Sequence, residues 1–192
     1  MSDCAQMAPR NDRRQRRQGA TSCAMIMRIL FALALLTIWI GCSVACYSAE
    51  TQLSTGSTQI KMLNGPGNVV SVCISITKTP RQDLYRHSFM WGGDESQPPR
   101  WVISEINVVE NRQMLVVPLS AYADLGDPRR MILDPLSAGH FKLTILGGDA
   151  AGAYKASMQF DQREIVRRRV VSGEFPDDVW EETTYSFNHL DN

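Results

Sequence analysis

The sequence predicts an all-β protein, a single antiparallel β-sandwich, with a small β-barrel as the alternative. Three observations lead to this prediction. Runs with a two-residue apolar period recur along the chain, pairs of these runs flank turn-forming loops, and no stretch shows a sustained helical stripe of apolar residues. Seven or eight short strands in roughly 140 residues are typical of two packed sheets. A barrel would close the same strands into one sheet.

The clearest predicted strand lies at 68–77. Four β-branched residues there alternate with Ser, Cys and Thr, directly after a Gly/Pro turn at 64–67. Two further alternating runs, 141–145 and 154–160, flank the loop 147–152. Two alternating runs joined by a Gly/Asp loop predict a β-hairpin.

A third pair of strands is predicted at 164–171 and 179–187, on either side of the turn 172–178. If these strands pair antiparallel, the Arg167–Arg169 triplet lies across from Glu181 and Glu182. Opposite charges across neighbouring strands contribute roughly 0.2–1 kcal/mol per pair. Adjacent strand residues point to opposite faces, so the triplet is divided between the two faces and does not form a nucleic-acid-binding patch.

Weaker signals fill the middle of the chain. Three shorter runs are predicted as strands, at 101–109, 112–118 and 130–133. No more than a turn or two of helix is expected within 80–89 and within 119–125, because neither segment has the caps or the long apolar stripe of a longer helix.

The N-terminal region differs from the rest in charge. The 192 residues have a formal net charge of zero, but residues 1–28 carry six arginines against two aspartates, a net charge of +4. Residues 29–46 carry no charge, and the chain from Tyr47 onward has a net charge of −4. An acidic body disfavours nucleic acid and anionic lipid as partners. The membrane is therefore expected to be contacted only through the N-terminal segment.

The apolar run predicts export to the cell envelope or secretion. Residues 25–49 are interpreted as a signal peptide, a lipoprotein signal or a membrane anchor. Residues 1–24 are then a disordered basic extension, which lies ahead of the true start if translation begins at Met25 or Met27. A polar, Ser/Thr-rich tether is expected at 50–60, followed by the sandwich domain at 61–190.

Three fates are open to this segment. Cleavage after Ala45 or Ala49 would release the body, because both offer the small residue that signal peptidase requires. The residues before Cys42 and Cys46 resemble a bacterial lipobox, although both lack its Leu three positions earlier, so either cysteine is a candidate for lipidation. A retained anchor is the third fate, since about 18 apolar residues can just span a bilayer and the upstream arginines would stay in the cytoplasm.

No motif of a known catalytic or metal centre is present. The sequence contains no G-x-S-x-G, H-E-x-x-H, phosphate-binding Gly loop or CxxC, and only three histidines. Only Cys73 falls in the body, so a disulfide framework is not expected. The tripeptide Gly-Gly-Asp at 92–94 and 147–149 is interpreted as turn chemistry rather than as calcium loops, which need six to eight oxygen ligands. We predict no catalytic residue, cofactor or metal.

The best candidate ligand site surrounds the loop 92–100. Trp91 and Trp101 flank this loop, and Asp94 and Arg100 supply charge. Exposed aromatic rings beside polar side chains are typical of sugar- or peptide-binding surfaces. The alternative is that both tryptophans cap the hydrophobic core.

These observations favour an exported, envelope-associated binding or structural module, whose partner would be an envelope glycan, a peptide or a protein. A secreted hydrolase is the alternative, with Asp and Glu residues of the loops 92–100 or 121–135 as the catalytic groups. A third hypothesis is a structural subunit that assembles through an exposed strand edge. Convergent carboxylates would favour the enzyme, and an aromatic patch above the loops would favour binding.

Overall fold

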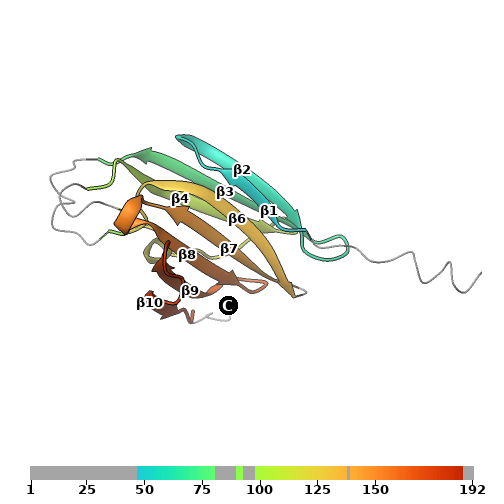
Figure 1. Cartoon of the computed structure of the whole chain (residues 1–192). Helices are drawn as coiled ribbons and strands as arrows, with labels where there is room; N and C mark the ends of the chain where they lie inside the picture. The colour runs from blue at the N-terminus through green and yellow to red at the C-terminus, as the bar shows by residue number, and fades with distance from the viewer. Residues whose placement is uncertain (1–46, 81–89, 93–97, 138, 188–192) are drawn as a thin grey trace, which may run out of the picture. The chain divides into compact units, whose positions relative to one another are not determined.

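A computed structural model describes residues 47–80, 90–92, 98–137 and 139–187 (Figure 1). Nearly every regular element in these ranges is a strand. The strands are β1 (Ala49–Gln52), β2 (Gly56–Leu63), β3 (Val69–Lys78), β4 (Trp101–Glu110), β5 (Gln113–Met114), β6 (Pro128–Ser137), β7 (His140–Gly147), β8 (Tyr154–Phe160), β9 (Ile165–Ser172) and β10 (Val179–Thr184). Two 3₁₀ turns, η1 (Leu119–Ala121) and η2 (Ala150–Gly152), complete the set.

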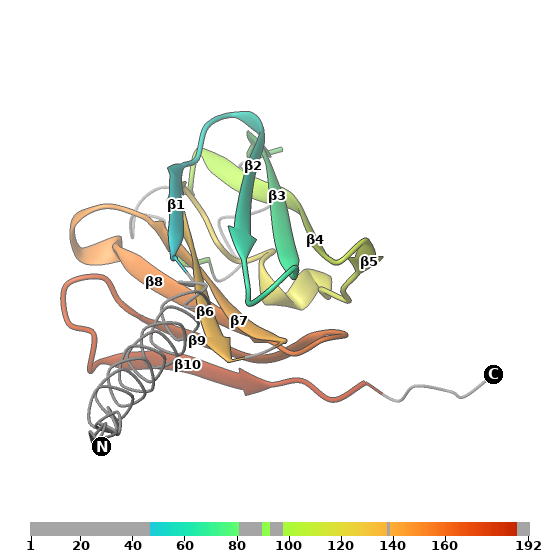
Figure 2. The same ribbon diagram turned by 90° about the vertical axis from the view of Figure 1, so that its right-hand side faces the viewer.

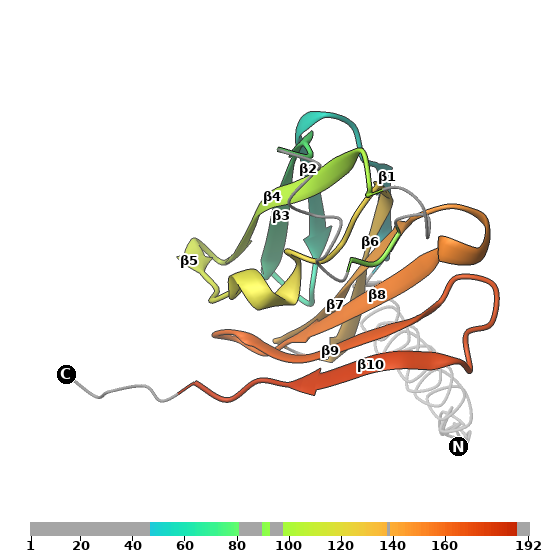
Figure 3. The same ribbon diagram turned by 90° about the vertical axis from the view of Figure 1, so that its left-hand side faces the viewer.

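The strands form two antiparallel sheets, and the predicted sandwich is confirmed. The larger sheet has the order β1-β6-β7-β8-β9-β10, and the smaller has the order β2-β3-β4-β5. Figures 2 and 3 show the two sheets as separate layers, with β10 at the outer edge of the larger one. The sheets do not close into a barrel.

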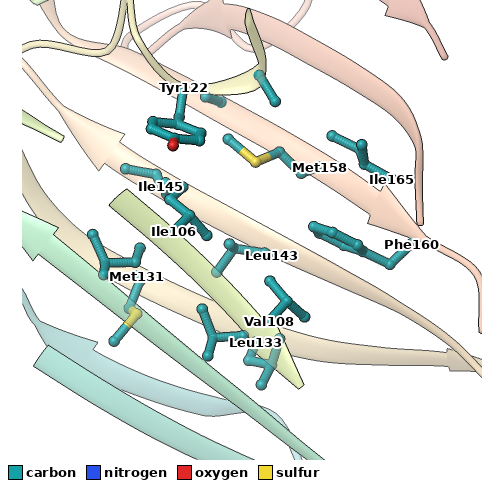
Figure 4. Close-up of a cluster of buried hydrophobic side chains, with 14 of the residues drawn as sticks. Ile106, Val108, Tyr122, Met131, Leu133, Leu143, Ile145, Met158, Phe160 and Ile165 are labelled. Carbon is teal, nitrogen blue, oxygen red and sulfur yellow. The ribbon is translucent and has the colours of Figure 1, made fainter. Parts of the chain in front are cut away.

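The core lies between the two sheets. In β3 the four apolar residues predicted to share a face, Val70, Val72, Ile74 and Ile76, are buried, as the two-residue period requires. Figure 4 shows side chains of β4 in one buried cluster with side chains of β6, β7 and β8. In the β7–β8 hairpin, the rings of Phe141 and Phe160 stack with their centroids 4.9 Å apart.

The three strongest sequence predictions are confirmed. The strand 68–77 is β3, and the predicted hairpin is the antiparallel pair β7–β8. The last two strands, β9 and β10, also pair antiparallel, with Arg169 opposite Glu182. Of the weaker signals, 101–109 becomes β4, 130–133 is the centre of the longer β6, and 112–118 yields only the two-residue β5.

The predicted tether at 50–60 is wrong. These residues contribute β1, which pairs with β6, and the first half of β2, which pairs with β3. The outer face of β2 is polar because its side chains bond to those of β3: the Ser57 and Ser75 hydroxyls are 2.9 Å apart, and Gln59 Nε2 donates to Ser71 Oγ at 3.0 Å. Polar cross-strand pairs of this kind stabilise a sheet without an apolar pattern. The folded domain therefore includes residues that the sequence assigned to the signal segment and the tether.

Helical structure is limited, as expected. The segment 119–125 contains η1 alone, and 81–89 lies outside the described residues. Within the ranges that the structure describes, no helix is long and apolar enough to cross a membrane. The basic extension 1–24 and the apolar run up to Cys46 also lie outside these ranges, so their predicted roles stay predictions.

Candidate functional site

Three of the predicted site residues, Trp91, Arg100 and Trp101, are held by one loop, 124–127. The Trp91 backbone N–H donates to the Asp124 carbonyl at 2.8 Å, and the Asp127 N–H donates to the Trp101 carbonyl at 2.8 Å. Asp127 Oδ1 accepts in turn from the backbone N–H groups of Arg100 and Trp101, at 2.9 and 3.0 Å. The loop thus fixes the backbone on both sides of the segment 92–100.

The two tryptophans occupy different environments. Trp101 begins β4 opposite Lys78 and is 38% exposed. Trp91 packs against the hydrophobic core and stacks on Trp180, with ring centroids 5.1 Å apart and an interplanar angle of 17°. Arg100 is exposed, and Asp94 lies outside the described residues. The stacking partner of Trp91 is therefore a residue of β10, more than eighty positions away, which the sequence did not single out.

Gly92 and Gly148, one from each Gly-Gly-Asp segment, lie side by side. A Cβ added to Gly148 would lie 2.8 Å from the Cα of Gly92, and both glycines have positive φ, +66° and +82°. Tyr154 is buried beside them and donates its hydroxyl to the Gly126 carbonyl at 3.0 Å. Burial raises the pKa of Tyr154, and the Asp124 carboxylate adds to this shift. These glycines serve close packing of loops, in agreement with the turn interpretation.

A calcium role for these loops gains no support. Asp149 is exposed and forms an ion pair with Arg129 at 3.4 Å. Among the described residues, no group of three or more His, Cys, Asp and Glu side chains is placed to hold a metal ion.

A buried arginine joins the loop 124–127 to β10. Arg168 is only 3% exposed, and its guanidinium contacts both oxygens of Asp124 at 2.7 Å and Glu181 Oε1 at 2.7 Å. Thr183 also donates to Glu181, at 2.9 Å. The neighbours of Arg168 in the triplet point to the other face of β9, as predicted: both Arg167 and Arg169 are exposed. They pair with Glu182 across β10.

Aromatic rings lie on both sides of this charged group. Trp180 precedes Glu181, stacks on Trp91 and donates its indole N–H to Asp178 at 2.8 Å. Tyr185 follows the end of β10 and stacks on Phe187 with centroids 6.2 Å apart. Burial raises the pKa of Tyr185, although a hydrogen bond with Ser120 and the charge of Arg168 oppose the shift.

We call the four partly buried residues Trp91, Trp180, Tyr185 and Phe187 the aromatic strip. Trp180 and Tyr185 are five positions apart, which corresponds to about 17 Å of strand. The strip therefore has a charged, hydrogen-bonded centre and an aromatic pair at each end.

The aspartates proposed for hydrolysis have separate roles. Asp124 pairs with Arg168, whereas Asp127 binds the backbone N–H groups at the start of β4. Asp134 lies in β6, where it accepts a hydrogen bond from Ser48 and pairs with Lys142 at 3.2 Å. Burial favours the neutral form of Asp134, but the Ser48 hydrogen bond and the Lys142 ammonium outweigh it and lower the pKa of Asp134. Asp124 and Asp127 belong to one loop and Asp134 belongs to β6, and each carboxylate has its own partners.

Sequence reasoning missed Arg168, Trp180 and Tyr185 as members of one site. A usable signal existed for Arg168, because it shares its face of β9 with the buried Val170. Trp180 has no comparable local signal, since its stacking partner Trp91 is distant in the sequence. Tyr185 stacks on Phe187, two positions away, and this spacing is a local signal. Comparisons with protein families, curated proteins and solved structures find no match for this chain.

Proposed function

We propose that this chain is an exported, envelope-associated binding module and that its ligand contacts the aromatic strip. The observation that supports this proposal is the pair of ring stacks on either side of Arg168, at the edge strand of the larger sheet. Flat ring faces contact apolar faces of sugars or side chains, and nearby polar groups orient them. The ligand is accordingly an envelope glycan or an extended peptide.

The state of the carboxylates favours binding over hydrolysis. Asp124 and Glu181 are both engaged by the one guanidinium of Arg168, which offsets one of their two negative charges. A glycosidase-type mechanism needs two carboxyl groups about 5 to 9.5 Å apart that face one substrate. Asp127 is engaged by backbone N–H groups, and Asp134 is engaged by Ser48 and Lys142.

Substitution Trp180→Ala is expected to weaken ligand binding about tenfold or more, because aromatic anchors dominate most binding surfaces. The measurement is a pull-down and titration with purified envelope glycan strands and with envelope peptides. The matched control is Trp101→Ala, which removes a tryptophan from the start of β4. Thermal unfolding of both variants separates loss of binding from loss of fold. Binding that survives Trp180→Ala but not Trp101→Ala would contradict the proposed surface.

The position of β1 leads to a prediction about processing. Ala49 pairs with Leu133, and Ser48 donates to Asp134, so cleavage after Ala49 would remove two contacts of the folded domain. Cleavage between Ala45 and Cys46 preserves both, whether or not Cys46 then carries a lipid. We therefore expect the exported protein to begin no later than Cys46. Intact-mass measurement of membrane and secreted fractions tests this, and a mature chain that begins at Glu50 would show it to be wrong.

A further inference from the structure

A polar recess lies at the end of the sandwich opposite the loop 124–127. Trp101 pairs with Lys78 at one end of the β3–β4 ladder, and Glu110 pairs with Val70 at the other, where the recess is found. Its volume is about 400 Å³, within the range of about 300 to 1,000 Å³ typical of ligand sites. Turns of both sheets supply its polar side chains, which are Asn64, Asn68, Glu110, Asn111, Gln113 and Gln162.

Among the described residues, Glu110 is the only charged one that lines this recess. It is 5% exposed, and its Oε1 accepts a hydrogen bond from Asn68 Nδ2 at 2.7 Å. In the part of the chain that the structure describes, no Lys, Arg or His forms an ion pair with it. A buried carboxylate without a cation is unfavourable unless another charge compensates it.

A second acceptor lies next to this carboxylate. The Oδ1 atom of Asn68 is buried and accepts no hydrogen bond from the described residues. It belongs to the same carboxamide that donates to Glu110, so the two acceptors are adjacent. Buried polar atoms are nearly always hydrogen-bonded in folded proteins. An acceptor pair of this kind is completed by a group that brings both positive charge and N–H donors.

Hydrogen bonds within the protein hold parts of the recess wall in place. Asn111 and Val69 exchange two hydrogen bonds, Asn111 N–H to Val69 O at 3.0 Å and Val69 N–H to Asn111 Oδ1 at 3.1 Å. Asn111 and Arg112 have φ of 49° and 72°, the conformation of a two-residue type I′ hairpin turn. Asn64 Nδ2 donates to the His140 carbonyl at 3.3 Å and so links the two sheets. Little ordering is then left for a ligand to impose.

We infer that this recess binds an organic cation with N–H donors, an alkylammonium or a guanidinium group, with Glu110 as its counter-ion and Asn68 Oδ1 as a hydrogen-bond acceptor. The surrounding carboxamides supply further acceptors. A calcium ion fits less well, because it needs six to eight oxygen ligands and usually several carboxylates, whereas one carboxylate lines the recess. The described residues that line the recess include no aromatic side chain to stack on a sugar ring.

The inference is tested by NMR titration of the ¹⁵N-labelled protein with n-butylammonium, with a capped Gly-Lys-Gly peptide, with agmatine, with neutral n-butanol and with calcium chloride, at constant ionic strength. We expect the amides of Asn68, Glu110 and Asn111 to shift with the cations and not with the alcohol. Tighter binding of the peptide than of n-butylammonium would identify a side chain of a partner protein as the source of the cation. Tighter binding of the free amine would identify a small molecule.

The matched variants are Glu110→Gln and Glu105→Gln. Glu110→Gln keeps the side-chain size and an acceptor for Asn68 but removes the charge, and is expected to weaken cation binding at least tenfold. Glu105→Gln alters an exposed glutamate of the same strand and should leave affinity unchanged. Absence of shifts with every cation, equal binding of the alcohol, binding of calcium alone, or unchanged affinity in a folded Glu110→Gln variant would each overturn the inference.

Discussion

Substitution Arg168→Met is expected to lower the free energy of unfolding by about 3 kcal/mol. The guanidinium is 3% exposed and is the common partner of Asp124 and Glu181. Its removal leaves two partly buried carboxylates close together with no cation between them, and buried charges that lose their partner account for many large mutational effects. Urea unfolding, followed by tryptophan fluorescence and by circular dichroism, measures the change.

Two comparisons show whether charge is the cause of this loss. Arg167→Met removes a cation from the exposed face of the same strand, where the pair with Glu182 should contribute less than about 1 kcal/mol. Adding Asp124→Asn and Glu181→Gln to Arg168→Met should restore much of the stability, because no charge then remains unpaired. If Arg168→Met cost no more than Arg167→Met, the buried ion pair would have no structural importance.

Substitution Gly148→Ala is the second change with a large expected effect, a loss of about 3 kcal/mol or more. The left-handed backbone at Gly148, with φ +66°, costs a non-glycine residue roughly 1–2 kcal/mol. The new Cβ would also lie 2.2 Å from the Gly152 carbonyl oxygen and 2.8 Å from the Cα of Gly92. Both atoms belong to the backbone, so the loops themselves must move, and such overpacking typically adds about 1–3 kcal/mol.

Gly67→Ala provides the control for this prediction. Gly67 has a similar φ of +74°, but no atom lies within 4 Å of its added Cβ. The expected loss is therefore the backbone cost alone, about 1–2 kcal/mol. Thermal and urea unfolding of both variants gives the difference, which reports the loop contact. Equal losses in the two variants would mean that Gly148 does not pack tightly against Gly92 and Gly152 in solution.

The strands that the sequence predicted best are those with one buried and one solvent-exposed face. In β3 and in the β7–β8 hairpin, apolar residues alternate with polar ones because successive side chains face the core and the solvent in turn. This pattern can be read from the local sequence alone. β1 and β2 escaped detection for the opposite reason. Polar residues of β2 form hydrogen bonds with Ser71 and Ser75, and β1 pairs with β6. These partners are distant in the sequence, so a local pattern does not reveal them.

The candidate sites also depend on partners that are distant in the sequence. The sequence named Trp91, Trp101 and Arg100 because they are adjacent in the chain, and the structure instead stacks Trp91 on Trp180. The polar recess combines turns separated by up to about a hundred residues, and none of its members carries a motif. Glu110 is the last residue of β4, and nothing in the local sequence indicates that it is buried without a cation.

By itself the sequence determined the class of fold, the outward and inward faces of the main strands and the division of Arg167–Arg169 between two faces. These properties depend on local periodicity and on the geometry of a single strand. The tertiary structure alone decided where the domain begins, which carboxylates are neutralised and which polar groups converge on the recess. Those outcomes depend on the long-range pairing of β1 with β6 and on the contacts between turns that meet at each end of the sandwich. Such contacts are set by the packing of the whole chain.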